Sequence, residues 1–162
     1  MGYASLVLAA IVVLSGFQVL QTMVLREGTA LLTMKFFYLD FTGLVLFCVF
    51  LGLAIKAAQQ RDIPLHLRLI TCTAIIPLEA VLERTYLYGI PSLVPNFDVA
   101  LMASEYTLIP AMAALVISEW WYGRFRWPFA AMLAYYLLML FTQDAVAGAE
   151  WFKSAAVSYA NW

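Results

Sequence analysis

The chain has 162 residues, of which 65% are hydrophobic and 12% are charged, and its formal net charge is -1. Soluble proteins contain about 45–50% apolar and about 25% charged residues, so this composition excludes a water-soluble globular domain. The balanced charge also excludes the basic surface that binds nucleic acid. The length fits one domain, and we expect a single transmembrane domain over residues 1–162.

Apolar segments follow one another along the chain, and each is long enough to cross a bilayer as a helix of about 20 residues. The first lacks the basic start of a signal peptide and is expected to remain as a helix. The pattern predicts an all-α integral membrane bundle of about five transmembrane helices, over residues 3–25, 31–57, 65–88, 97–122 and 127–148. Pro64 and Pro128 stand at the starts of two of these helices, where a missing N–H is tolerated.

The last segment, residues 149–162, is rich in aromatic side chains and contains a single lysine. Aromatic residues gather where a membrane meets water, so this composition predicts an interfacial tail rather than another crossing.

Basic residues indicate the orientation, because cytoplasmic loops are enriched in Lys and Arg. The loops after the second and fourth predicted helices have the basic residues Lys56, Arg61, Arg68, Arg124 and Arg126 in or beside them. We therefore predict a multi-pass protein of a bacterial inner membrane, with the N-terminus cytoplasmic and the C-terminus periplasmic.

Charged residues inside the predicted helices point to a polar cavity. A charge at membrane depth costs about 2.5–3.5 kcal/mol on insertion scales, so each one requires a reason. In the predicted orientation these residues gather in the outer half of the bundle. The expected ligand-binding residues are Asp40, Glu79, Glu83, Arg84, Glu105 and Tyr106.

A purely structural interpretation applies to part of this set. Polar groups such as Asp98, Arg84 and Asp144 can lie at the interface, and others can form hydrogen bonds between helices. The excess of acids over bases argues against structural pairing alone. A buried carboxyl group is expected to be protonated or matched by a bound cation.

Three functions remain open on the sequence. The first is a protein that binds a lipophilic ligand or a cation in the cavity, or that serves as an accessory subunit. The second is a membrane-embedded cyclase or isomerase of an isoprenoid or lipid, with Glu79 and Glu105 as catalytic carboxyl groups and Glu79 as the general acid. The third is a structural subunit of a respiratory or photosynthetic complex.

The expected partners are the lipid bilayer, a lipophilic small molecule, and further copies of the chain or a larger membrane complex. The sequence identifies no cofactor. A zinc or copper site is disfavoured because His66 is the only histidine.

The stretch from Arg61 to Leu69 opens a helix with His66-Leu67-Arg68-Leu69, and Arg84 follows near the far end of the same helix. With the later run Glu119-Trp120-Trp121-Tyr122-Gly123-Arg124, it resembles a group of uncharacterised bacterial inner-membrane proteins that begin this helix with H-x-R-L. The resemblance covers the second to fourth helices and implies an inner-membrane location without an established activity.

The motif Pro77-Leu78-Glu79 is similar to the P-x-E motif of the heterodimeric type of membrane-embedded carotenoid cyclase. Ala80 stands where that family has a second acid. This likeness implies an isoprenoid substrate and a catalytic role for Glu79.

Overall fold

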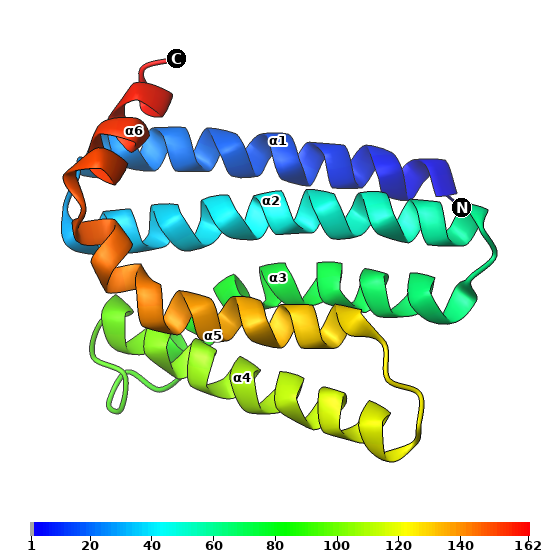
Figure 1. Ribbon diagram of the computed structural model, residues 1–162. Coiled ribbons are helices and arrows are strands. Elements are labelled where there is room, and N and C mark those ends of the chain that lie inside the picture. Colours follow the sequence, from blue (N-terminus) through cyan, green and yellow to red (C-terminus); the bar gives the residue numbers. More distant parts are fainter. Residues whose placement is uncertain (1) are drawn as a thin grey trace. The chain divides into compact units, whose positions relative to one another are not determined.

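A computed structural model describes residues 2–162, with side chains from Val7 onward, and within this range it contains no strand. The elements in chain order are α1 (Gly2–Glu27), α2 (Leu31–Gln59), α3 (Ile63–Gly89), α4 (Phe97–Trp121), α5 (Trp127–Gly148) and α6 (Glu150–Ala160) (Figure 1). The prediction of an all-α bundle is confirmed. Every predicted end of the first five helices lies within two residues of the observed one.

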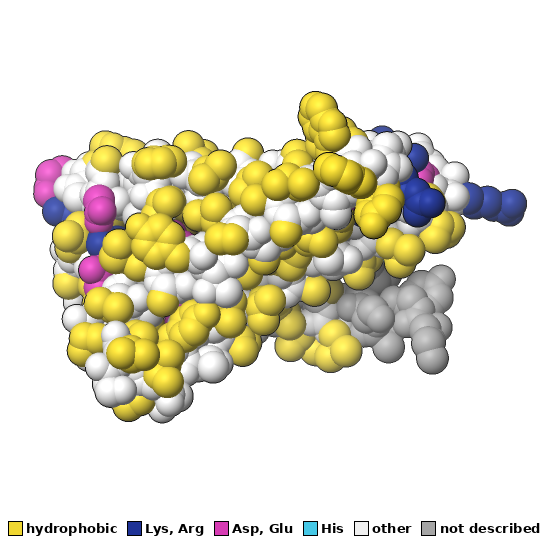
Figure 2. Space-filling model, turned by 90° about the horizontal axis from the view of Figure 1, so that it is seen from below, with side chains coloured by type: hydrophobic (Ala, Val, Ile, Leu, Met, Phe, Trp, Pro, Cys, Tyr) yellow, Lys and Arg dark blue, Asp and Glu magenta, His cyan; other side chains and the backbone are white. Residues whose placement is uncertain are grey.

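Five of these helices, α1 to α5, are long and apolar enough to cross a membrane. Their outward side chains are largely hydrophobic, as at Leu14, Val81, Ile117 and Phe141. Figure 2 shows one face of the molecule, on which hydrophobic side chains cover the middle and charged side chains lie toward the ends. A surface of this kind is stable in lipid and not in water, so the chain is a small multi-pass membrane protein.

The chain forms two compact units. Unit 1 comprises residues 2–48 and 141–162, and unit 2 comprises Val49–Leu140. The long helices α2 and α5 therefore contribute one part to each unit. The organisation as a single transmembrane domain stays a prediction.

Unit 1 is built around a hydrophobic cluster to which α1, α2, α5 and α6 all contribute, with Leu20, Val24, Met34, Phe37, Ala147, Phe152, Ala156 and Ala160 buried. In Figure 1, α6 turns away from the end of α5 and lies against α1. Two hydrogen bonds fix it there: Gln21 Nε2 donates to the Ala160 carbonyl at 3.0 Å, and the Tyr159 hydroxyl donates to the Phe17 carbonyl at 2.8 Å. The aromatic tail expected at the interface is thus a helix docked on α1.

Polar contacts also join α2 to α5 within unit 1. Lys35 Nζ lies 2.7 Å from Asp144 Oδ1, and the Tyr38 hydroxyl lies 3.2 Å from Thr142 Oγ1. Polar bonds between membrane helices hold their relative rotation, because few other acceptors are present in lipid.

Unit 2 is organised by α3 and α4, which pack side by side as an antiparallel pair. Asp62 caps α3 by accepting a hydrogen bond from the Leu65 amide, and Asn96 caps α4 by accepting one from the Val99 amide. Side-chain oxygens at these positions satisfy amides that the first helical turn leaves without a partner. The His66 ring is 2.9 Å from the Ala54 carbonyl and so links the start of α3 to α2.

Candidate functional site

A cluster of buried polar side chains lies inside unit 2, formed by Glu79 of α3, Glu105 of α4 and Tyr136 of α5. The exposed fraction is 0% for Glu105 and Tyr136 and 9% for Glu79. Each carboxyl group lies close enough to the Tyr136 phenol to act on it electrostatically. We call these three residues the carboxyl–phenol cluster.

The helical period explains why these residues face inward. In α4 the buried positions recur every three to four residues and include Leu101, Glu105, Leu108 and Met112. In α5 the same spacing buries Phe129, Met132, Tyr136 and Met139. Positions at this spacing share one face of a helix, so Glu105 and Tyr136 occupy core positions within largely apolar stripes.

The cluster lies well inside the membrane-crossing part of the helices. At a rise of 1.5 Å per residue, Glu79 is about 15 Å before the end of α3 and Glu105 about 12 Å after the start of α4. These two helix ends are joined by one loop, so the carboxyl groups have similar depths. Tyr136 is about 18 Å before the end of α5 on the same scale.

Hydrogen bonding within the cluster is incomplete. The buried Tyr136 hydroxyl has no hydrogen-bond partner among the described residues. The Oε1 atoms of Glu79 and Glu105 are buried and accept no hydrogen bond from them either, although both side chains take part in other interactions. A buried hydroxyl left unsatisfied costs about 1–3 kcal/mol, and this phenol is able to donate a hydrogen bond to an incoming group.

Two basic side chains of unit 2 form ion pairs with carboxylates near the helix ends. Arg68 pairs with Glu119, and Arg126 Nη1 lies 3.0 Å from Asp62 Oδ2. These pairs lie at the ends of the helices, where the free-energy cost of a charged side chain is lower than at the depth of Glu105. At that depth a carboxyl group favours either its protonated form or a bound cation.

The structure distributes the six predicted ligand-binding residues over three environments. Glu79, Glu83 and Glu105 are buried in unit 2. Arg84 and Tyr106 are exposed on the surface of the same unit, where Arg84 Nη1 donates to the Ala80 carbonyl at 2.7 Å. Asp40 is exposed on α2 within unit 1.

The predicted site does not include Tyr136. The sequence nevertheless places Tyr136 and Gln143 seven residues apart, on one face of the fifth helix. The signal that identifies it is its position inside α5, far from the ends where membrane tyrosines usually gather. Glu105, Met112 and Glu119 are seven residues apart in turn and are all buried, so this heptad stripe is the inner face of α4.

The residues described hold no group of three or more His, Cys, Asp or Glu side chains arranged to bind a metal ion. Comparison of the chain with protein-family models, with curated proteins and with solved structures found no match.

Proposed function

We propose that this small membrane protein is a binding protein and that the carboxyl–phenol cluster of Glu79, Glu105 and Tyr136 is its site. The ligand is a cation or a lipophilic molecule that carries a positive charge or a hydrogen-bond donor. The observation that supports this most strongly is the complete burial of Glu105 on α4 and Tyr136 on α5, far from the ends of both helices.

The energetics favour a binding role over a purely structural one. An acid in the middle of a crossing helix costs about 2.5–3.5 kcal/mol on insertion, and an apolar residue of similar volume would avoid that cost. Polar groups that serve only to join helices are satisfied by each other. The Tyr136 hydroxyl instead is buried without a hydrogen-bond partner among the described residues, so its hydrogen-bonding capacity remains available to a ligand.

We further place the protein in a bacterial inner membrane with the N-terminus in the cytoplasm and the C-terminus in the periplasm. The α2–α3 and α4–α5 loops are joined by the ion pair of Arg126 with Asp62 and by the hydrogen bond from Arg68 Nη2 to the Arg124 carbonyl. The basic residues of both loops therefore lie at one end of unit 2. Such a concentration is typical of a cytoplasmic side.

The binding role is tested by identifying the small molecules and metal ions that stay bound to the protein during purification. The wild type, Glu105→Gln and Tyr136→Phe would be extracted in a mild detergent, and bound molecules and metals identified by native mass spectrometry and elemental analysis. We expect a bound species in the wild type that is strongly depleted in both variants. Tyr88→Phe is a matched control, because it removes a hydroxyl from a tyrosine that is 72% exposed on α3.

Melting temperatures measured on the same samples separate loss of ligand from loss of fold. Depletion in variants that remain folded supports the site. Equal bound content in all four proteins, or no bound species in a folded wild type, would falsify the binding role.

A further inference from the structure

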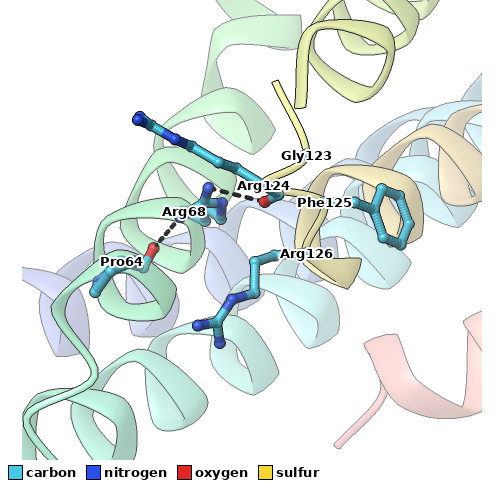
Figure 3. Close-up of a pocket in the computed structure, with 6 residues that line it drawn as sticks. All are labelled: Pro64, Arg68, Gly123, Arg124, Phe125 and Arg126. Carbon is cyan, nitrogen blue, oxygen red and sulfur yellow. Dashed lines mark hydrogen bonds between the residues drawn. The ribbon is translucent and has the colours of Figure 1, made fainter. Parts of the chain in front are cut away.

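A second site lies at the basic end of unit 2, where a cavity of about 460 Å³ opens between the start of α3 and the α4–α5 loop. Its lining residues are Pro64, Arg68, Gly123, Arg124, Phe125 and Arg126 (Figure 3). Half of the lining residues are arginines, and no carboxylate belongs to the lining. We infer that this cavity binds the phosphate group of an anionic membrane lipid.

The cavity wall is held in shape by the guanidinium group of Arg68. Its Nη1 donates to the Pro64 carbonyl at 2.8 Å and its Nη2 to the Arg124 carbonyl at 3.3 Å (Figure 3). Its Nε donates to the Glu119 carboxylate. The same carboxylate accepts a hydrogen bond from the Arg126 amide at 3.2 Å. One Arg–Glu pair therefore fixes both the start of α3 and the loop that follows α4.

Gly123 allows that loop to turn. Its φ of +63° lies in the left-handed region, which glycine adopts at no steric cost. The turn directs the Arg124 carbonyl toward Arg68, while the Arg124 side chain extends away from it (Figure 3). The Arg124 guanidinium has no hydrogen-bond or ion-pair partner within the described part of the chain. Its N–H donors are therefore not engaged by the described residues, and their fork geometry suits phosphate oxygens.

At this end of unit 2 the positive charges outnumber the carboxylates that neutralise them. Asp62 pairs with Arg126 and Glu119 pairs with Arg68. Arg124, the third arginine of the lining, has no counter-ion among the described residues. An anion in the cavity therefore meets a net positive field rather than a balanced one.

The surroundings indicate a lipid as the source of the phosphate. Exposed aromatic side chains stand next to the Gly123–Arg126 loop in the sequence, namely Trp120, Trp121 and Tyr122 before it and Trp127 after it, and Phe125 within the loop is exposed as well. Tryptophan and tyrosine gather at the depth of lipid headgroups. Basic pockets between membrane helices at that depth bind anionic headgroups. The same groups would also accept free inorganic phosphate, so the test must separate the two sources.

The experiment measures lipid retention by native mass spectrometry of the whole protein in mixed micelles. The micelles contain phosphatidylglycerol, phosphatidylcholine, or phosphatidylglycerol with an excess of inorganic phosphate. We expect phosphatidylglycerol to be retained in preference to phosphatidylcholine and not to be displaced by inorganic phosphate. Arg124→Gln should weaken retention about fivefold, the effect of removing one basic residue at an anionic headgroup.

Arg61→Gln is the matched control, since it removes the same charge from the same end of unit 2 without altering the cavity lining. It should leave retention unchanged if the cavity is the site. An equal loss in Arg61→Gln and Arg124→Gln would overturn the proposal in favour of diffuse attraction. Equal retention of the two lipids would overturn it as well, and displacement by inorganic phosphate would reject the lipid as the source. Far-ultraviolet circular dichroism verifies that both variants keep their helices.

Discussion

Arg68, in the second turn of α3, and Glu119, near the end of α4, form an ion pair through Nε and Oε1. The two side chains are 17% and 10% exposed. The pair therefore lies in a largely dry environment, and it locks the antiparallel register of the two helices.

We expect Glu119→Gln to lower the free energy of unfolding by about 1–2 kcal/mol, more than the loss of an exposed pair, because it leaves the partly buried Arg68 cation without its counter-ion. The measurement is a denaturant titration in mixed micelles. Lys153→Gln is the control: its partner Glu150 is 86% exposed, and such pairs contribute about 0–1 kcal/mol. Equal effects of the two variants would show that the Arg68–Glu119 pair does not stabilise unit 2.

Gly16 marks a close approach of α1 to α2 in unit 1. A Cβ atom added there would lie 2.9 Å from both terminal carbons of Leu44. We expect Gly16→Ala to change stability by less than about 1 kcal/mol, because the higher helix propensity of alanine offsets the displacement of the flexible end of Leu44. The double variant Gly16→Ala with Leu44→Ala should show a favourable coupling energy in a double-mutant cycle. Strict additivity would contradict the contact.

Tyr159 makes the docking of α6 sensitive to alkaline pH. Burial raises the pKa of the Tyr159 phenol above its usual value, and the neutral hydroxyl donates to the Phe17 carbonyl. Because the folded state holds this proton more tightly than the unfolded state, the stabilisation is complete below a pH of about 10 and is lost as the pH rises above it.

Stability measured across this alkaline range should therefore fall more steeply for the wild type than for Tyr159→Phe. The variant should also lose about 1 kcal/mol at neutral pH, the usual contribution of one hydrogen bond. Identical alkaline slopes in the two proteins would show that Tyr159 does not titrate in the way described.

Much of the fold follows from the sequence because the membrane imposes it. A chain in lipid must satisfy its backbone within each segment, so the length of an apolar run nearly determines a helix. Pro64 and Asn96 then mark where helices begin. The docking of α6 was not predictable in this way, because it depends on contacts such as Gln21 with Ala160 that are far apart in the chain.

The candidate site was predictable only in part. Glu79 and Glu105 are visible as acids inside apolar helices, where the cost of charge makes them exceptional. The position of Tyr136 in the middle of an apolar helix is also visible in the sequence, but only tertiary packing shows that its side chain is buried. Arg68 was interpreted as a marker of orientation, since its pairing with Glu119 depends on the register of the α3–α4 hairpin.

The proposed orientation predicts the compartment of each loop. Alkaline phosphatase folds into its active form only in the oxidising periplasm, because it needs disulfides. We expect an active fusion after Trp162 and an inactive one within the α2–α3 loop. A green fluorescent protein fused at the same positions should give the reverse pattern. Activity of alkaline phosphatase in the α2–α3 loop would invert the assignment and place the basic cavity outside the cell.

The carboxyl–phenol cluster predicts that Tyr136→Phe separates stability from function. Removing a buried hydroxyl that has no hydrogen-bond partner in the described structure should leave the ligand-free protein equally stable or about 1 kcal/mol more stable. The same change should deplete the bound species, because the hydroxyl oxygen is an acceptor for the cation or the donor group of the ligand. Denaturant titration before and after exhaustive detergent washing measures both effects. A loss of several kcal/mol in the washed protein would instead identify Tyr136 as a structural hydrogen-bond partner, and its role in binding would be abandoned.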